Sequence, residues 1–305
     1  MAKSSKPVLL DCDPGIDDAV AILLGLASPE ISFVGITTVA GNVDLGCTTE
    51  NALRVAALGG GRVIPVYAGC PKAILGAPPP ATHVHGNDGL GGVMLPPGGT
   101  AQAEHAVNAL LRIPTEIEDL SLVAIGPLTN LAVMLTQEPE IAGRIGRTVI
   151  MGGGIEGGNV TPAAEFNIHF DPEAARAVFE SRLRPILVPL DLTRKAAVHE
   201  DWINRLRALG TPVAIAASGM MDFYLEAVRH RGLGMIIHDA TALAVEIWPE
   251  LFDIRPARIR IATDHGPERG RTLVDFGSSE PNGAVAVDLD APTFTERLFE
   301  RLSLL

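Results

Sequence analysis

Short apolar runs alternate along the chain with longer segments in which apolar residues recur at helical spacing. The runs that predict strands are residues 7–11, 32–38, 63–67, 120–125, 147–151 and 185–190. Helical patterns follow several of them, at 17–25, about 45–58 and 127–135. Because these strands are continuously apolar, they are typical of parallel strands buried on both faces. The pattern therefore predicts an α/β fold with an open, mainly parallel central sheet flanked by helices.

Two segments depart from this pattern. Residues 71–100 are rich in Pro and Gly, and a loop of this length is typically functional or mobile. Residues 212–238 are mostly helical and end in a Gly-containing stretch that we expect at the rim of the molecule. The last part predicts a small group of strands at 257–262, 272–276 and 284–289, then a helix at about 293–304. No linker-like change in composition separates these parts, so we expect one domain over 1–305.

The charge and cysteine content narrow the classes of partner. The 305 residues include 36 acidic and 24 Lys or Arg residues, for a formal net charge of -12. This argues against an electrostatic nucleic-acid binder and against a polybasic membrane anchor. The three cysteines lack CxxC spacing, and no signal peptide or membrane-spanning apolar stretch is visible. We expect a soluble, cytoplasmic protein.

The densest chemical signal is a group of four carboxylates, Asp11, Asp13, Asp17 and Asp18. Asp11 and Asp13 leave the end of a predicted strand on the same side, and Asp17 and Asp18 open the following helix. Solvated helix-capping acids are the simpler interpretation for one such residue. Four of them near the carboxyl end of a strand indicate instead a hard divalent cation with oxygen ligands.

Two other metal-dependent motifs deserve comparison with this group. An EF-hand requires Gly at position six and Glu at twelve, whereas Gly15 stands at five and Ile22 at twelve. A metal-dependent phosphohydrolase that uses the Asp11/Asp13 pair is a closer rival. It would need a phosphate cradle, which the glycines of 152–154 could supply, although a run of glycines more often marks a sharp turn.

The sequence resembles the inosine/uridine-preferring nucleoside hydrolases. The motifs that carry the resemblance occur in family order: DCDPGIDDA (11–19), TTVAGN (37–42), HGNDGL (85–90), AIGPLTN (124–130), MGGG (151–154), AEFN (164–167), DPE (171–173) and HD (238–239). The resemblance implies a Rossmann-like nucleoside hydrolase fold and Ca²⁺-dependent cleavage of a ribonucleoside by water into ribose and a free base. It also suggests a homodimer or homotetramer.

The resemblance further implies roles for individual residues. Asp13 matches a metal ligand that is also the general base, and Asn42 matches a polar group beside the metal and the water. The other implied metal ligands are Asp18, Asp239 and the carbonyl of Ile125, and Asp239 is also expected to contact the substrate. Residues at positions that hold the ribose hydroxyls are Asp17, Asn159, Glu165 and Asn167. Asp11 matches a supporting position behind the ligands.

The residue types suit this reaction independently of the resemblance. Glycosidic cleavage through an oxocarbenium-like sugar needs an activated water and a stabilised leaving group. A cation can lower the pKa of a bound water, and a positioned carboxylate can remove its proton. No Lys or Arg lies within the matched motifs, which weighs against phosphate chemistry.

Several aromatic and histidine side chains are weaker candidates. His238 is a candidate proton donor to the departing base, because His titrates near neutral pH, and its alternative is a structural core histidine. His85 is a candidate base-pocket contact whose alternative is a solvated loop residue. Phe166 lies between candidate ribose ligands and could simply pack. Contact with the base and helix packing are both open for Phe223, Tyr224 and His230.

Two alternatives to a nucleoside hydrolase stay open from the sequence, a metal-dependent phosphohydrolase and a non-catalytic nucleoside-binding protein. Loss of the residue at position 13 would favour a binding protein, yet Asp13 is present. The preferred base is not encoded in any motif that we recognise. It depends on the loop at 71–90 and the rim at 220–238.

Overall fold

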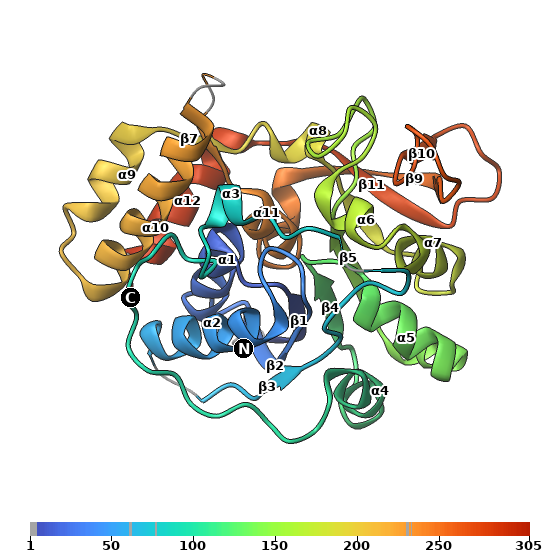
Figure 1. The fold of residues 1–305 in the computed structure, drawn as a ribbon, viewed down its shortest axis with the longest axis horizontal. Coiled ribbons are helices and arrows are strands. Elements are labelled where there is room, and N and C mark those ends of the chain that lie inside the picture. The colour runs from blue at the N-terminus through green and yellow to red at the C-terminus, as the bar shows by residue number, and fades with distance from the viewer. Residues whose placement is uncertain (1–4, 61–62, 77, 230–231, 233) are drawn as a thin grey trace.

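Nine strands form one twisted sheet that runs through the middle of the molecule (Figure 1). The computed structural model describes residues 5–60, 63–76, 78–229, 232 and 234–305. The strand order is β10-β9-β11-β6-β5-β4-β1-β2-β3. The bounds are β1 (Lys6–Cys12), β2 (Ile31–Thr38), β3 (Val66–Ala68), β4 (Ser121–Ala124), β5 (Arg147–Met151), β6 (Ile186–Val188), β9 (Phe252–Ile261), β10 (Thr272–Asp275) and β11 (Gly283–Leu289).

Most neighbouring strands in this sheet are parallel, as the apolar pattern predicted. The exception is β9, which runs antiparallel to both β10 and β11. A separate two-stranded sheet pairs β7 (Ala197–Val198) with β8 (Met235–Ile236). The structure therefore confirms an α/β fold with a mixed, mostly parallel sheet.

Helices connect the strands and cover both faces of the sheet. Their bounds are α1 (Ile16–Leu26), α2 (Leu45–Leu58), α3 (Thr82–His85), α4 (Ala106–Glu116), α5 (Thr129–Gln137), α6 (Phe166–Phe170), α7 (Pro172–Glu180), α8 (Leu190–Thr193), α9 (Glu200–Arg207), α10 (Pro212–Val228), α11 (His238–Ile247) and α12 (Ala291–Leu302). Short 3₁₀ helices lie at η1 (Pro139–Arg144) and η3 (Pro249–Leu251).

The alternation of side chains along β1 shows how the core is divided. Val8 and Leu10 belong to the cluster that includes side chains of α1, α10, α11 and α12. Leu9 points to the other face and belongs to the cluster with α4, α5 and α7. All three side chains are fully buried, and each such burial is worth about 1.5–3 kcal/mol of transfer free energy. Burial on both faces explains why the strands are continuously apolar.

The structure corrects several expected boundaries. The third strand does not begin at Val63, which is 88% exposed, but at Val66. The C-terminal strands join the central sheet, because β11 pairs in parallel with β6. The long loop at 71–100 contains the one-turn helix α3, and the helix that begins at Pro212 ends at Val228. Within the described residues, no helix has the length and apolarity needed to cross a membrane.

The parallel strands bring the candidate chemistry to one edge of the sheet. β1, β4 and β5 are neighbours, and their carboxyl ends are at Cys12, Ala124 and Met151. Asp13, Ile125 and the glycine run therefore follow directly from the same edge, as expected for an open α/β sheet. Helices α1 and α11 pack against each other and begin at this edge.

Candidate active site

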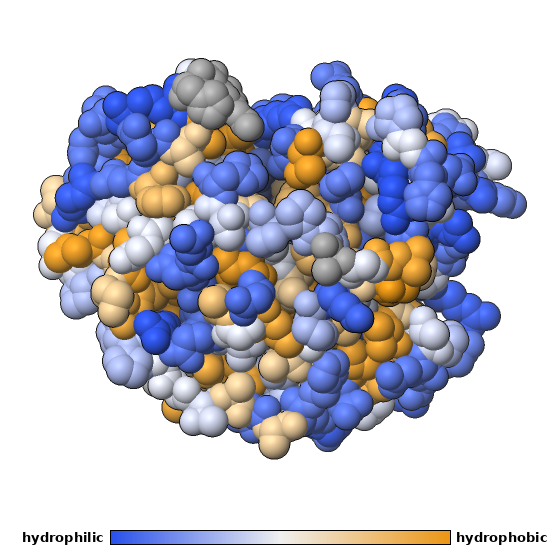
Figure 2. Space-filling view, in the orientation of Figure 1, coloured by the Kyte–Doolittle hydropathy of each residue, from blue (hydrophilic) through white to orange (hydrophobic). Residues whose placement is uncertain are grey.

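A cavity of about 330 Å³ opens at the carboxyl edge of the sheet. Figure 2 shows one face of the molecule, on which hydrophilic and hydrophobic residues are mixed. Segments distant in the sequence contribute to the cavity wall, and most of the candidate site residues are among them: Asp17, Asn42, His85, Ile125, Asn159, Glu165, Phe166, Asn167, His238 and Asp239. The fold thus brings together residues that the sequence motifs singled out separately.

Three buried carboxylates form the acidic end of this site. Oxygens of Asp17, Asp18 and Asp239 lie within 4.8 Å of one another. Asp17 and Asp18 stand in the first turn of α1, and Asp239 stands in the first turn of α11. Helix N-termini favour negative charge, so two converging helices offset part of the repulsion between the carboxylates.

Hydrogen bonds to the turn after β1 hold Asp18 in place. Its Oδ1 accepts the N–H of Asp13 at 3.1 Å, and its Oδ2 accepts the N–H of Gly15 at 3.0 Å. The side-chain amide of Asn42 also donates to Oδ2 at 3.1 Å. Asp18 therefore fixes the 13–15 backbone as well as contributing charge to the group.

One carboxylate oxygen of Asp13 is bound and the other is free. Oδ2 accepts the backbone N–H of Asn42 at 2.7 Å, and the Asn42 side chain donates to the Asp13 carbonyl at 3.2 Å. Oδ1 is buried and has no hydrogen-bond partner. A Cβ added to Gly41 would lie 2.0 Å from Oδ2, and one added to Gly126 would lie 2.5 Å from Oδ1. Glycines on both sides therefore let the backbone approach a side chain that keeps one oxygen available.

The carboxylates fit a hard cation. With no cation present, burial raises the pKa of Asp17 to about 7 and that of Asp18 to about 6. Burial followed by neighbouring carboxylates raises the pKa of Asp13 and Asp239 well above the usual range. The unpartnered oxygens include Oδ1 of Asp17 as well as that of Asp13. An all-oxygen set with unsatisfied buried acceptors is the donor chemistry that Ca²⁺ prefers.

Asp11 lies outside this arrangement, although it is also buried. Its Oδ2 accepts the hydroxyl of Thr37 at 2.6 Å and the side-chain amide of Asn130 at 2.8 Å. Burial raises the pKa of Asp11 to about 7. Its Oδ1 is buried without a hydrogen-bond partner, and among the described residues the cavity lining includes Asp17 and Asp239 but not Asp11, Asp13 or Asp18. The bonds of Oδ2 to Thr37 and Asn130 fit a supporting residue that holds β1 to its neighbours.

Glu165 occupies the glycine run that could have cradled a phosphate. Its Oε2 accepts the N–H of Gly153 at 2.8 Å, and its Oε1 accepts the N–H of Asn167 at 3.0 Å as the N-cap of α6. Burial raises the pKa of Glu165 to about 7. The N–H of Gly153 is therefore already paired within the protein and is not free to bind a phosphate.

Two asparagines and Phe166 complete the same wall. Asn167 donates from its side chain to the carbonyls of Ile125 at 2.9 Å and Met151 at 3.2 Å. Asn159 accepts the N–H of Phe166 through Oδ1 at 2.9 Å. The ring of Phe166 lines the cavity and lies 5.9 Å from that of Phe170. Phe166 thus combines packing with a place in the cavity wall.

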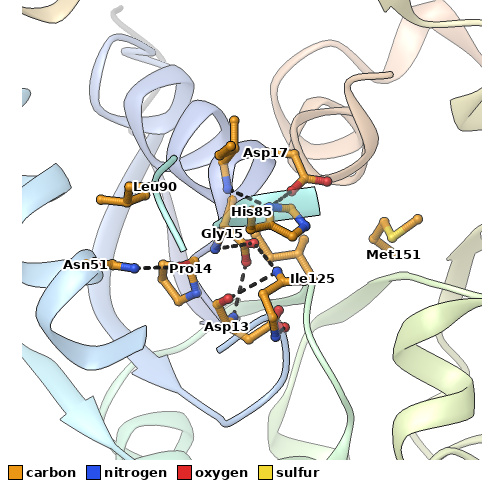
Figure 3. A network of polar contacts seen from close by, with 12 residues as sticks. Asp13, Pro14, Gly15, Asp17, Asn51, His85, Leu90, Ile125 and Met151 are labelled. Atoms are coloured by element: carbon orange, nitrogen blue, oxygen red, sulfur yellow. Dashed lines mark hydrogen bonds and ion pairs between the residues drawn. The ribbon is translucent and has the colours of Figure 1, made fainter. Parts of the chain in front are cut away.

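Both candidate histidines are buried and held through Nδ1. His238 Nδ1 lies 2.8 Å from the hydroxyl of Thr193, and burial lowers the pKa of His238 to about 4. His85 Nδ1 accepts the N–H of Ile16 at 3.0 Å, and burial lowers the pKa of His85 to about 3 (Figure 3). The alternative of a solvated loop residue is therefore wrong for His85. Burial therefore favours the neutral ring of His238, which differs from the near-neutral titration of an unperturbed histidine.

The rim candidates separate in the structure. Tyr224 lines the cavity, with its ring 6.0 Å from that of His85 in an edge-on arrangement. Phe223 is 39% exposed and is not among the described lining residues, and His230 lies outside the described residues. Lining residues outside the sequence motifs include Leu190, Arg194 and Ile236. Leu190 begins the one-turn helix α8, Arg194 follows that helix and Ile236 ends the two-residue strand β8, and no sequence signal marks these positions as part of a cavity.

Comparisons with known proteins identify the family to which the chain is similar. Residues 8–296 match the family model described as inosine-uridine preferring nucleoside hydrolase. The chain is 41% identical over 305 residues to the pyrimidine-specific ribonucleoside hydrolase RihA of Citrobacter koseri, covering 97% of this chain and 98% of that protein. It is 40% identical over 304 residues to RihA of Escherichia coli O127:H6, with the same coverage.

Solved structures show the same fold. The purine-preferring ribonucleoside hydrolase from Gardnerella vaginalis superposes with a TM-score of 0.93 at 33% identity, covering 98% of each chain. A plant nucleoside hydrolase, the PpNRh1 enzyme, also gives a TM-score of 0.93, at 30% identity over 98% of this chain and 99% of that one. The chain belongs to the inosine-uridine preferring nucleoside hydrolase family.

Proposed function

We propose that the protein hydrolyses the N-glycosidic bond of ribonucleosides and releases ribose and a free base. The observation that carries this proposal is the buried carboxylate group beside a cavity, with one Asp13 oxygen unpartnered. The 41% identity to a pyrimidine-specific ribonucleoside hydrolase supports pyrimidine ribonucleosides as the preferred substrates.

The residues proposed to hold a Ca²⁺ ion are Asp13, Asp18, Asp239 and the carbonyl of Ile125. When bound, the ion supplies positive charge that offsets the carboxylates and lowers the pKa of a water in contact with it. Asp17 belongs to the same group and lines the cavity, so we assign it to the ribose hydroxyls beside the ion. Asn159, Glu165 and Asn167 also line the cavity, and we assign them to the remaining sugar hydroxyls.

Asp13 is proposed as the general base. Its free Oδ1 takes a proton from the attacking water, while the N–H of Asn42 keeps Oδ2 in place. The water oxygen bonds to the anomeric carbon as the bond from that carbon to the base nitrogen breaks. The electron pair of the broken bond leaves with the base, which takes up one proton from solvent. Asp13 returns the proton of the attacking water to solvent, so the net reaction adds one water across the bond. Hydrogen bonds from the sugar-binding wall stabilise the oxocarbenium-like character of the sugar.

His238 is proposed to assist the departing base. Its Nδ1 is engaged with Thr193, so Nε2 is the ring nitrogen left to meet a base in the cavity. His85 is assigned to substrate recognition, because it joins α3 to the first residue of α1. Phe166 and Asn42 complete the proposed substrate and catalytic contacts.

The two rival functions are less well supported. A phosphohydrolase would need Asp11 and Asp13 to act as a pair and a glycine N–H free for phosphate, whereas Oδ2 of Asp11 is bonded to Thr37 and Asn130 and the N–H of Gly153 is bonded to Glu165. A binding protein would not require an unpartnered carboxylate oxygen next to the site. Incubation with uridine, inosine and uridine monophosphate separates the three. Free base indicates the hydrolase, inorganic phosphate indicates the phosphohydrolase, and neither product indicates a binding protein.

We also propose, from the family resemblance, that the chain acts as one catalytic domain within a homodimer or homotetramer. Light scattering of the purified protein tests the assembly. A monomer at micromolar concentration would contradict it.

A further inference from the structure

Side chains of the one-turn helix α8 and of the residue after it contact two parts of the site, the loop after β5 and His238. In Figure 1, α8 lies next to the loop that follows β5. The carboxylate of Asp191 accepts the N–H of Ile155 at 2.7 Å through Oδ2 and that of Glu156 at 3.0 Å through Oδ1. Arg194, just after the helix, donates from Nη2 to the carbonyl of Gly158 at 2.9 Å. The backbone from 155 to 158 is therefore held along α8.

This backbone leads directly into a proposed substrate residue. Residues 155–163 form neither helix nor strand. Within this loop, Oδ1 of Asn159 accepts the N–H of Phe166, the first residue of α6. The loop also bonds within itself, from the N–H of Gly158 to the carbonyl of Pro162 at 3.1 Å and from the N–H of Asn159 to that of Ala164 at 3.2 Å. Asp191 and Arg194 tie this self-closed loop to the body of the protein. The direction in which Asn159 faces the cavity depends on that tie.

The same helix also holds the ring of His238. Thr193, two residues after Asp191, places its hydroxyl 2.8 Å from Nδ1 of His238. The 155–158 backbone and the His238 ring are thus mounted on a single turn of helix. Holding both groups on one helix keeps them at a fixed distance and orientation, which a site needs when it must position the sugar and the base together.

We infer that Asp191 is a positioning residue for substrate binding. It is not among the described residues that line the cavity, so it acts by holding the 155–158 backbone and, through it, Asn159. A carboxylate that accepts two backbone N–H groups makes charge-assisted hydrogen bonds, which are stronger and more directional than neutral ones. This inference rests on the role proposed above for Asn159.

The Michaelis constants of Asp191→Ala and Asp191→Asn test whether Asp191 affects substrate binding. We expect Asp191→Ala to raise the Michaelis constant for uridine about tenfold with a smaller change in turnover, because a loosened binding group weakens ground state and transition state alike. Asp191→Asn keeps one acceptor oxygen and is expected to recover part of the loss. Asp290→Ala is the matched control, since Asp290 accepts the N–H and hydroxyl of Thr293 at the start of α12. It should leave the Michaelis constant unchanged.

Amide hydrogen exchange supplies a readout that does not depend on activity. In Asp191→Ala the peptide that spans 155–158 should exchange faster, while Asp290→Ala leaves that peptide unchanged. Unchanged exchange at 155–158 in Asp191→Ala would overturn the inference. If the alanine variant fails to fold, the same comparison is made with Asp191→Asn.

A double-mutant cycle with Asn159→Ala tests whether Asp191 acts through Asn159. In the Asn159→Ala background, Asp191→Ala should change the Michaelis constant by less than about twofold, the limit of additivity for independent sites. The same roughly tenfold increase in both backgrounds would overturn the inference and leave the proposed function intact. Asn159→Ala without any effect of its own would instead refute the role proposed for Asn159, and the inference would fall with it.

Discussion

His85 accepts the backbone N–H of Ile16 through Nδ1 at 3.0 Å, although 69 residues separate the two in the sequence. The first N–H groups of a helix have no partner within it, so His85 caps α1 from a distant loop. Asn51 makes a second connection nearby, because its side chain donates to the carbonyl of Pro14 at 3.0 Å (Figure 3) and to that of Asp88 at 2.8 Å. The middle of the long loop is thereby joined to the turn that carries the carboxylates.

This relationship predicts the effect of His85→Ala. The variant loses a cap on α1 and a residue of the cavity wall, so its Michaelis constant for uridine should rise more than its turnover falls. His105→Ala is the matched control, since His105 Nδ1 accepts the N–H of Val107 at the start of α4, and His105 is not among the described cavity-lining residues. Both variants should lose about 0.5–2 kcal/mol of stability, the usual effect of removing a cap. Equal Michaelis constants for the two variants would refute a recognition role for His85.

Asp13→Asn is expected to keep the fold and lose most of the activity. The substitution preserves shape and one ligand oxygen but removes the base, so turnover should fall by roughly 10²–10⁴. Circular dichroism checks the fold, and calcium titration calorimetry reports whether the ion still binds. Near-normal turnover with full calcium occupancy would eliminate Asp13 as the general base.

Calcium should stabilise the protein more at higher pH. Burial raises the pKa of Asp17 to about 7 and of Asp18 to about 6, so the metal-free folded state keeps protons that the unfolded chain releases above about pH 4. The contribution of these groups to stability is present below that pH and is lost as the pH rises through 6 and 7. A cation must displace these carboxylate protons, so its affinity for the site increases as the pH rises through 6 and 7.

The measurement is the melting temperature with calcium and with a chelator at about pH 5.5 and pH 8. The gain from calcium should be larger at the higher pH, and Mg²⁺ should give a smaller gain because it keeps more of its waters. A gain that is equal at both pH values, or larger at the lower one, would contradict the assignment of the buried carboxylates to a cation.

His238→Ala should separate leaving-group assistance from a structural role. Turnover on uridine and inosine should fall by about 10²-fold, because the departing base loses the hydrogen bond that the neutral His238 ring offers it. Hydrolysis of p-nitrophenyl riboside should be spared, because its leaving group is stable as an anion. Thr193→Val, which removes the hydroxyl at 2.8 Å from Nδ1, should show part of the same selective loss. Equal losses on natural and artificial substrates would mean that His238 only shapes the site.

The parallel core of the fold could be predicted from the sequence because its signal is local. Continuous apolar runs such as 147–151 mark strands buried on both faces, and β5 has those bounds. Strand pairing is not local. The pattern predicts the last strands as a small group but gives no sign that β11 inserts between β6 and β9. It also does not reveal α4, α7 or α9, and α9 is polar enough to resemble a surface loop in sequence.

The candidate site also has a part that local sequence pattern predicts and a part that only the tertiary structure shows. The carboxylates sit where a strand ends and a helix begins, a place that sequence pattern can identify. The structure adds which of them share a site, since Asp17 joins Asp18 and Asp239 while Asp11 bonds to Thr37 and Asn130. It also adds Arg194, whose place at the cavity depends on the tertiary path of the 155–158 loop. No local pattern encodes that path.

The most direct test of the proposed function is product analysis with the calcium-loaded protein. Uridine, inosine and uridine monophosphate are each incubated with it, and free base, ribose and inorganic phosphate are measured by chromatography and colorimetry. We predict equal amounts of uracil and ribose from uridine, slower release of hypoxanthine from inosine, no phosphate, and loss of activity on chelation that calcium restores. Release of phosphate without base, or no base from any ribonucleoside with calcium bound, would contradict it.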